Sequence, residues 1–445
     1  MSPMLKHATQ LSLAALIAVA VAHGADDSSL AHLSFQPSMQ AGFHDTNGNF
    51  VAGTEVMHLV PHKGRLYAST SLWMEKDPSI PKACQVLALD SPKSQWRVER
   101  QFTTNNLRWG CLKAVTFSTG KVSLLLAAPD VRRGPVKIFC RNDDTGEWSA
   151  SVLGSVTNYT TTRSIGLHRD NVTGIDRVFA GTDKLGVIGG VHDPTAPGRI
   201  RWEGSPEFRA PIGERVMGFC DCNGIFYCAT SRHIFRRTDG AAPAWKEIYF
   251  CEKETSPCGI RGLSAVPNPS GTGEALLFAA LSKVRRLDPA DGFKETVELD
   301  IPAFLTQKLG VRVSFALSAY NEFMRYTMPG TGEAVWLFGF ESTYPPAVFR
   351  AKPTPKLRLF VREEPRSFFA AEARFCIRHA NGTDIRYELA EVTDPRQPTL
   401  VATRAIAVSP FAEDRGRAFY FGGFDCNSVP SHNTAWIYRA EPRHP

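Results

Sequence analysis

The sequence lacks any run of about twenty consecutive apolar residues, which is the length that a helix needs to cross a bilayer. Cysteine is sparse, with 10 in 445 residues, and this excludes a small disulfide-stabilised scaffold. The net charge is only +7 and the basic residues are dispersed, which argues against nucleic acid as a partner. A hydrophobic content of 43% excludes a disordered chain.

Several catalytic motifs are also missing. There is no Gly-x-Ser-x-Gly elbow, no Gly-Lys-Ser/Thr phosphate loop, no His-Glu-x-x-His and no Cys-x-x-Cys-His haem site. The Ser-x-Asp-x-Gly-x-Thr-Trp repeat of sialidases and the Trp-Asp dipeptide of intracellular propellers are absent. No stretch sustains apolar residues at helical spacing between caps, so the chain is predicted to be all-β.

Residues 1–24 are typical of a secretory signal. Lys6 precedes the apolar run from Leu11 to Ala22, and small residues at Ala22 and Gly24 suit cleavage after Gly24. Removal of the signal leaves a charge of +6, because it takes away Lys6 and no acid. We therefore expect an exported protein, secreted or periplasmic, with residues 25–445 forming one domain and no membrane span.

Export permits disulfides. Cys251 and Cys258 could close a short loop, and Cys220 and Cys222 would point to one face of a strand. A metal site at Cys220, Cys222 and Cys228 matches no zinc spacing and is disfavoured. No cofactor is predicted; structural calcium is conceivable, although no loop has a calcium-binding spacing.

The strongest pattern is an internal repeat. A large apolar residue followed by a small one recurs every 48–83 residues, after a strand and a turn. The copies are Tyr67-Ala68, Leu126-Ala127, Phe179-Ala180, Tyr227-Cys228, Phe278-Ala279, Phe338-Gly339 and Phe421-Gly422. Aromatic residues mark a later strand in six of the repeats, at Trp96, Trp148, Trp202, Trp245, Phe293 and Tyr387. Short strands that repeat near fifty residues are typical of propeller blades.

Seven copies predict a seven-bladed β-propeller with four-stranded antiparallel blades. The last copy ends with the strand Thr434–Arg439 and lacks a fourth strand, which Ala31–Gln36 could supply to close the ring. A large sandwich or a two-domain β protein is the less favoured alternative. An inserted basic loop, 341–373, would join the second and third strands of the sixth blade, either as a flap over a binding funnel or as a solvated excursion.

Propeller geometry brings the starts of the inner strands and the ends of the second strands together at one mouth. The predicted starts are Glu55, Trp109, Arg163, Arg215, Arg261, Arg312 and Arg404. The predicted ends include Trp73, Asp130, Asp183, His233, Glu341, Asp425 and His432. Five arginines at strand starts favour an anion-binding funnel, although about half of them are expected to pair with carboxylates. Trp73 and Trp109 could stack on sugars or fill the core.

This architecture, with its export signal and polar mouth, resembles secreted seven-bladed propellers. Among enzymes of that fold, the chain is most similar to the propeller polysaccharide lyases that cleave uronic-acid glycans. The resemblance implies β-elimination, which needs a cation to neutralise the uronate carboxylate and groups that move protons. Arg163, Arg215 or Arg261 could neutralise the carboxylate, and Tyr159 or His233 could move protons.

The sequence does not decide whether the protein is an enzyme. The predicted partner is an acidic glycan or another anionic ligand, held by Arg163, Arg261, Arg312, Arg404, Trp73, Trp109, Glu55, Asp425 and His432, and the protein is predicted to be a monomer. The alternatives are a non-catalytic glycan- or protein-binding propeller and a glycoside hydrolase, since this fold hosts all three. A hydrolase would need two carboxylates about 5 to 10 Å apart.

Overall fold

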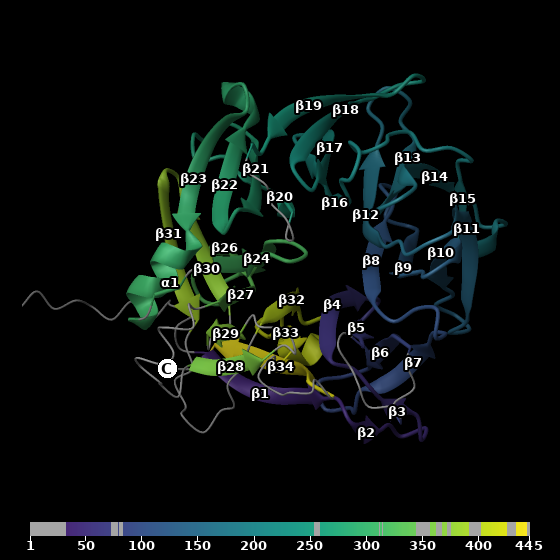
Figure 1. The fold of residues 1–445 in the computed structure, drawn as a ribbon, viewed down its shortest axis with the longest axis horizontal. Coiled ribbons are helices and arrows are strands. Elements are labelled where there is room, and N and C mark those ends of the chain that lie inside the picture. Colours follow the sequence, from purple (N-terminus) through teal and green to yellow (C-terminus); the bar gives the residue numbers. More distant parts are fainter. Residues whose placement is uncertain are drawn as a thin grey trace, which may run out of the picture.

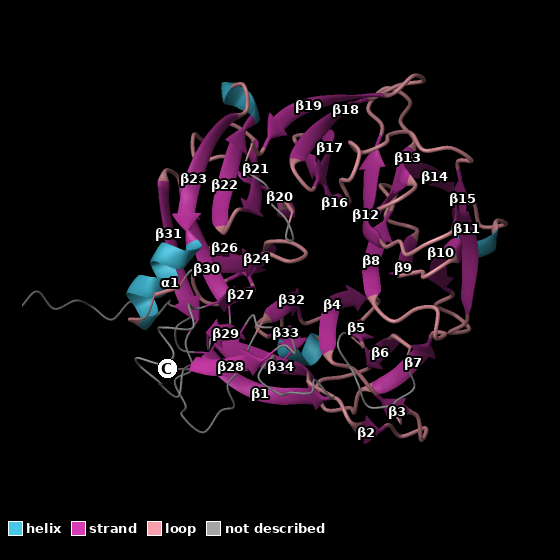
Figure 2. Cartoon of the chain, viewed as in Figure 1, coloured by secondary structure: helices cyan, strands magenta, loops and turns pink. Residues whose placement is uncertain are grey.

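Seven four-stranded antiparallel sheets stand around a central axis (Figures 1 and 2). This is a computed structural model, and it describes residues 33–72, 79, 83–252, 259–310, 312–313, 315–343, 357–361, 367–371, 375–390, 402–424 and 433–442. The prediction of a seven-bladed β-propeller is confirmed. Within these ranges no helix is long and apolar enough to cross a membrane.

The blades follow one another in chain order around the ring, and each begins with its innermost strand. The first strands are β4 (Glu55–His62), β8 (Trp109–Thr116), β12 (Thr162–Arg169), β16 (Val216–Cys222), β20 (Arg261–Pro267), β25 (Met324–Thr327) and β32 (Thr403–Val408). The second strands are β5 (Arg65–Ser71), β9 (Ser123–Pro129), β13 (Asp176–Thr182), β17 (Ile225–Thr230), β21 (Glu274–Ala280), β26 (Ala334–Phe338) and β33 (Phe419–Phe424).

The outer half of each blade completes the sheet. The third strands are β6 (Gln85–Leu89), β10 (Gly134–Arg141), β14 (Gly186–His192), β18 (His233–Thr238), β22 (Lys283–Asp288), β30 (Phe375–Asn381) and β34 (Ala435–Pro442). The fourth strands are β7 (Arg97–Gln101), β11 (Trp148–Val156), β15 (Ile200–Trp202), β19 (Ala244–Phe250), β23 (Lys294–Asp300), β31 (Asp384–Ala390) and β1 (Leu33–Gln40).

The described residues also form smaller sheets and short helices outside the seven blades. Three two-stranded sheets are formed by β2 (Phe43–His44) with β3 (Phe50–Val51), β24 (Phe315–Ser318) with β27 (Phe340–Thr343), and β28 (Leu357–Val361) with β29 (Ser367–Ala371). The helices are α1 (Ile301–Leu309) and the 3-10 turns η2 (Pro197–Arg199), η3 (Pro289–Asp291) and η4 (Ala412–Asp414). The elements β27, β28 and β29 lie in the chain between β26 and β30, the second and third strands of the sixth blade, and much of the predicted loop 341–373 lies outside the described residues.

The N-terminal strand closes the ring. β1 pairs antiparallel with β34, so that Leu33 lies opposite Pro442 and Gln40 opposite Trp436. The seventh blade thus combines three strands from the end of the chain with one from its beginning, as the repeat predicted. Within the described residues the pairing runs from Leu33 to Gln40, four residues beyond the expected end at Gln36, and it satisfies a sheet edge that would otherwise be open.

The repeated motif lies on the second strand of each blade, where the blades crowd together. In the sixth blade the second motif residue must be glycine, because a Cβ atom at Gly339 would lie 2.1 Å from the carbonyl oxygen of Thr403 in the next blade. The outer aromatics fill the widening gap between blades. The Trp96 indole, for example, is buried in a cluster that joins the first blade to Ala405 and Tyr420 of the seventh.

Strand direction separates the connections onto two faces. Because neighbouring strands are antiparallel, the loops from second to third strands and from a fourth strand to the next blade emerge on the same face, which we call the mouth face. The tight turns that join first to second and third to fourth strands emerge on the opposite face.

On that opposite face, buried histidines join neighbouring blades. His168 of the third blade contacts two carboxylates of the fourth: its Nδ1 lies 2.6 Å from Asp221 and its Nε2 lies 3.0 Å from Asp239. With both ring nitrogens facing carboxylates, the geometry suits the imidazolium form. Burial alone would lower the pKa of His168, but the bonds to Asp221 and Asp239 outweigh burial and raise the pKa.

This contact predicts a pH-dependent contribution to stability. A histidine whose pKa is higher in the folded state stabilises fully below its unfolded value, and the stabilisation disappears as the pH rises through the folded value. Between about pH 6 and about pH 8.5, the melting temperature of the His168→Gln variant should fall less than that of the wild type. The exposed His44 provides the control substitution, His44→Gln, which should match the wild type. If the melting temperatures of all three proteins changed with pH in the same way, the prediction would be contradicted.

No disulfide joins the cysteines that the structure describes. The described cysteines carry free thiols; they are Cys84, Cys111, Cys140, Cys220, Cys222, Cys228, Cys251 and Cys376, and all are buried. The suggested Cys251–Cys258 bridge includes Cys258, which lies outside the described residues. The Cys220 and Cys222 side chains share a face of β16, as predicted, but they contribute to the packed core between blades instead of a bridge.

Candidate functional site

A short segment before β25 enters the central channel (Figure 1). Asn321 fixes this segment, because its side-chain amide donates to the backbone oxygens of Met57 at 2.6 Å and Arg404 at 3.2 Å. The backbone N–H of Ala319 donates to the Gly339 oxygen at 2.9 Å. Close approach also needs a glycine at position 262, where a Cβ would lie 2.6 Å from that of Ala319. Residues 319–323 are therefore held from several blades.

Tyr320 is the central side chain of this segment. The Cζ atom of Arg261 lies 4.4 Å from the centroid of the Tyr320 ring, and that of Arg404 lies 4.5 Å from the same centroid. Two further guanidinium groups are close enough to act on the phenol electrostatically. We call the four residues the arginine cluster; they are Arg108, Arg163, Arg261 and Arg404.

Carboxylates balance most of the charge of the arginine cluster. Arg404 donates to Glu55 at 2.9 Å and to Glu341 at 3.0 Å. Arg108 donates to the other oxygen of the fully buried Glu55 at 3.1 Å. Arg163 donates to Asp183 at 2.8 Å. Among the described residues, carboxylates thus pair with Arg108, Arg163 and Arg404. Two of these, Arg163 and Arg404, belong to the five arginines predicted at strand starts, which agrees with the expectation of partial pairing.

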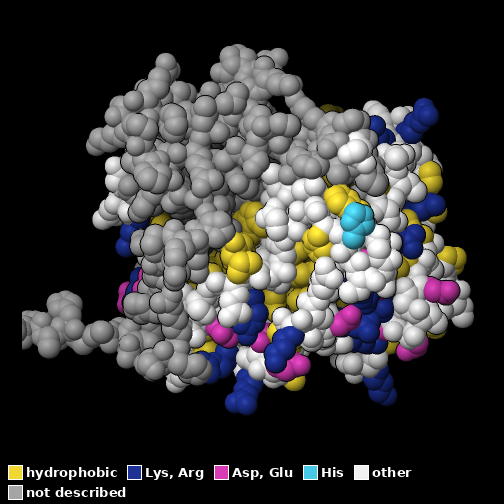
Figure 3. Space-filling model, turned by 90° about the horizontal axis from the view of Figure 1, so that it is seen from below, with side chains coloured by type: hydrophobic (Ala, Val, Ile, Leu, Met, Phe, Trp, Pro, Cys, Tyr) yellow, Lys and Arg dark blue, Asp and Glu magenta, His cyan; other side chains and the backbone are white. Residues whose placement is uncertain are grey.

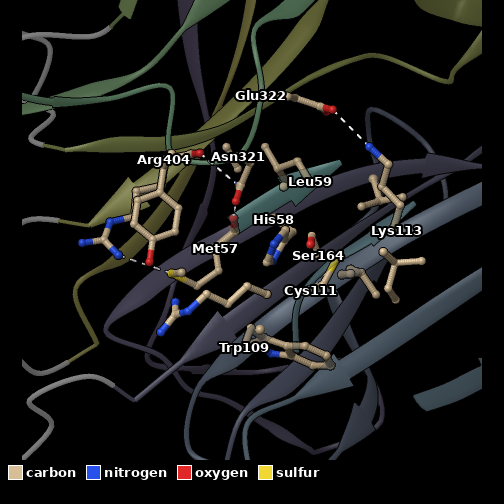
Figure 4. A pocket seen from close by; sticks show the side chains of 18 of the residues that line it. Met57, His58, Leu59, Trp109, Cys111, Lys113, Ser164, Asn321, Glu322 and Arg404 are labelled. Carbon is tan, nitrogen blue, oxygen red and sulfur yellow. Dashed lines mark hydrogen bonds and ion pairs between the residues drawn. The ribbon is translucent and has the colours of Figure 1, made fainter. Parts of the chain in front are cut away.

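The arginine cluster opens onto a cavity of about 290 Å³ that extends along the channel (Figure 4). Its lining includes Arg163, Arg261, Arg404 and Tyr320, and its walls are the inner strands of several blades. At the far end Lys113 and Glu322 form an ion pair of 3.1 Å, and both side chains are about half exposed to this space. Among the described residues that line the cavity, Glu322 is the one carboxylate, so a phenol and guanidinium groups, not paired carboxyls, face a ligand.

The surroundings make Tyr320 unusually acidic. Burial alone would raise its pKa, but the four guanidinium groups of the arginine cluster outweigh burial and lower the pKa of Tyr320 to about 8. A tyrosine with this pKa is partly ionised near neutral pH, and a phenolate can accept a proton. Perturbed groups of this kind inside a cavity are typical of functional sites.

The pKa of a second tyrosine at the mouth, Tyr159, is shifted in the opposite direction. Tyr159 lies in the connection between β11 and β12, is 44% exposed, and its hydroxyl accepts a hydrogen bond from Thr161 at 2.9 Å. Burial of the hydroxyl raises the pKa of Tyr159, although Arg108 and Arg163 act against this. Beside it, burial raises the pKa of Asp130 to about 6. Tyr159 therefore keeps its proton where Tyr320 releases one.

His58 lines the same cavity but takes a structural position. Its Nδ1 lies 3.0 Å from the Ser69 hydroxyl, and burial lowers the pKa of His58 to about 3. The ring is therefore neutral over the pH range of most enzymes.

The structure brings several predicted residues together and separates others. Arg163, Arg261, Arg404 and Glu55 do meet at the mouth, with Tyr159 nearby. Trp109 lines the cavity wall but is only 3% exposed; its indole N–H donates to the Gln85 oxygen at 2.9 Å, and its ring packs on Phe102. This placement favours core filling over sugar stacking. Trp73, Asp425 and His432 lie outside the described residues.

Three predicted residues lie away from the cavity lining. Arg312 was expected to start the sixth inner strand, and this is wrong: that strand starts at Met324, and Arg312 is exposed between α1 and β24. His233 stacks between Phe235 and Phe250 and contacts Glu214 at 2.8 Å. Arg215 is exposed, and its backbone N–H donates to Ser231 at 3.2 Å. The geometry thus gives neither His233 nor Arg215 a place beside Tyr320.

Sequence reasoning missed Tyr320 and Arg108. The turn Pro329-Gly330-Thr331-Gly332 could have indicated Tyr320. In the other blades such a turn follows the inner strand, so an inner strand of similar length that ends at this turn would start near Tyr320. Arg108 immediately precedes Trp109, which took its place in the prediction. Within the part of the chain that the structure covers, no group of three or more His, Cys, Asp or Glu side chains could hold a metal ion.

Comparisons with known proteins do not identify a family for this chain. No protein-family model matches the chain, and no curated protein matches it. One similar solved structure is a protein of unknown function from Bacteroides thetaiotaomicron, 9% identical over 70% of this chain and 72% of that one, with a TM-score of 0.37. Another is a candidate exo-beta-1,3-galactanase from Bifidobacterium bifidum, 14% identical over 59% and 92%, with a TM-score of 0.30. Such low similarity carries no argument about function.

Proposed function

We propose that the mouth of the channel binds the carboxylate of an acidic saccharide and that the protein cleaves the chain by β-elimination. The observation that carries the proposal is the arrangement of four guanidinium groups around one phenol, Tyr320, at the opening of a cavity. In this proposal the protein is exported and meets polysaccharide outside the cytoplasm.

The arginine cluster supplies the electrostatic part of the reaction. A uronate carboxylate placed there accepts hydrogen bonds from the guanidinium groups, and these groups stabilise the negative charge that develops on the carboxylate as the neighbouring C5 proton leaves. Since the donors are already held by Glu55, Glu341 and Asp183, they need little reorganisation during the reaction.

The two tyrosines then have opposite roles. The Tyr320 phenolate takes the proton from C5, the C5–H electron pair forms the C4=C5 double bond, and the C4–O bond breaks. The leaving oxygen takes a proton from Tyr159, and exchange with solvent restores both tyrosines. Environments that move two titratable groups apart are the usual basis for assigning a base and an acid. The carboxylates do not favour a hydrolase, since Glu55 is buried and Glu341 is held by Arg404.

The pH profile tests this proposal. Turnover of polyuronates, followed by the absorbance of the unsaturated product, should rise between about pH 6 and about pH 8, by about tenfold for each pH unit below the pKa of the base. The rise should level off near the pKa of Tyr320, which is about 8, and turnover should fall again once Tyr159 loses its proton. A flat profile over this range, or activity with neutral galactan only, would contradict the assignment of Tyr320.

A further inference from the structure

The mouth face of the second to fourth blades carries basic side chains that the arginine cluster does not use. We call them the basic arc; they are Arg132, Arg133, Lys184, Arg209 and Arg215. All five are exposed, and none forms an ion pair with a carboxylate among the residues that the structure describes. They are therefore available to a ligand.

The acidic side chains of the same loops are bonded to the protein. Asp130 accepts from the backbone N–H of Arg108. The others pair with cations: Asp183 with Arg163, Glu203 with Arg177, Glu207 with Arg237 and Glu214 with His233. Negative charge in these loops is thus matched by cations or by a backbone N–H of the protein, while the five cations of the basic arc face the solvent.

Backbone contacts join the loops of the basic arc from blade to blade. Val131 forms a β-bridge with Thr160, next to Tyr159, and the Asp183 N–H donates to the Thr161 oxygen at 2.9 Å. Val187 forms a similar bridge with Phe208, beside Arg209. The Asp130 N–H also donates to the Arg108 oxygen at 2.9 Å, so the arc is continuous with the arginine cluster.

Another edge of the ring shows a different charge distribution. Basic and acidic side chains are interspersed on the edge that carries β1, β2 and β3, where Arg97 pairs with Asp90 and Arg65 with the same carboxylate (Figure 3). Cations and anions on that edge cancel one another. The basic arc therefore differs from that edge of the ring.

We infer that the basic arc binds an extended acidic polysaccharide that runs from the mouth of the channel over the second, third and fourth blades. This inference rests on the proposed function and deepens it, because it makes the substrate a polymer instead of a short oligosaccharide. A single uronate needs only the arginine cluster, whereas five exposed cations on loops that contact one another match carboxylates that repeat along a chain. The exposed ring of Tyr159 lies within the arc and offers a sugar-stacking surface.

The test compares two variants that each lose three positive charges. The arc variant is Arg133→Gln/Lys184→Gln/Arg209→Gln. The control is Lys93→Gln/Lys121→Gln/Lys246→Gln, which removes exposed lysines outside the loops of the arc. Binding of long-chain polygalacturonate, trigalacturonate, dextran sulfate and polyglutamate to the full chain is measured by calorimetry at several salt concentrations, together with the melting temperature of each variant.

The arc variant should bind polygalacturonate roughly tenfold more weakly than the wild type, since each exposed ion pair contributes a few-fold. Its affinity should also depend less on salt, while trigalacturonate binding and the control variant stay unchanged. Equal polymer affinity in the two variants would overturn the inference, as would a wild type that binds no polyanion or binds polyglutamate as tightly as polygalacturonate. The arc variant could lose dextran sulfate binding while the wild type fails to bind trigalacturonate. This result would support polysaccharide binding by the basic arc and would refute the proposed function.

Discussion

Replacement of Tyr320 by phenylalanine should lower kcat on a polyuronate by about 10²- to 10⁴-fold, the range expected when a general base is lost. The phenylalanine ring retains the packing between Arg261 and Arg404 but cannot accept a proton. The melting temperature should therefore stay close to that of the wild type. Residual turnover should lose its dependence on a group with a pKa of about 8.

The matched control is Tyr227→Phe. The Tyr227 hydroxyl is buried and has no hydrogen-bond partner among the described residues, and its side chain does not line the cavity. This variant should keep wild-type turnover. Wild-type kcat in Tyr320→Phe would rule out the proposed base. If Tyr320→Phe lost turnover and trigalacturonate binding to the same extent, Tyr320 would position the uronate and would not remove its C5 proton.

The propeller could be predicted because its signals are local and repeated. In each blade the motif has a large residue followed by a small one, and at Gly339 the next blade leaves no room for a Cβ. Outer aromatics such as Trp96 fill the widening gap. Ring closure could also be anticipated, because a seventh copy without a fourth strand requires one from elsewhere, and β1 provides it.

The site was only partly predictable, because one blade departs from the repeat. In the sixth blade the inner strand has four residues, from Met324 to Thr327, and the chain before it bends into the channel. The even spacing of the repeats therefore predicted that the inner strand of the sixth blade starts at Arg312. In the structure Tyr320 takes the place at the mouth. Pairings such as Arg404 with Glu55 join residues 349 positions apart, and no local pattern encodes such a contact.

Replacement of Arg237 by methionine should lower the free energy of unfolding by about 3 to 5 kcal/mol, as when one partner is removed from a buried charge network. The Arg237 side chain is fully buried and binds three carboxylates: Asp170 at 3.0 Å, Glu207 at 2.7 Å and Asp239 at 2.5 Å. Asp170 and Glu207 are buried too, so they would lose their main counter-charge without gaining water. Since Arg237 and Asp239 belong to the fourth blade and Asp170 to the third, the loss falls on the contact between blades.

The adjacent residue provides the control for this prediction. Arg236 also lies on β18, but its side chain points to the other face and is exposed, so Arg236→Met should cost less than about 1 kcal/mol. Urea unfolding of both variants measures the difference. A triple variant that also carries Asp170→Asn and Glu207→Gln should regain part of the loss, because it removes the uncompensated negative charge as well. Similar unfolding free energies for Arg237→Met and Arg236→Met would mean that packing, not this network, holds the third and fourth blades together.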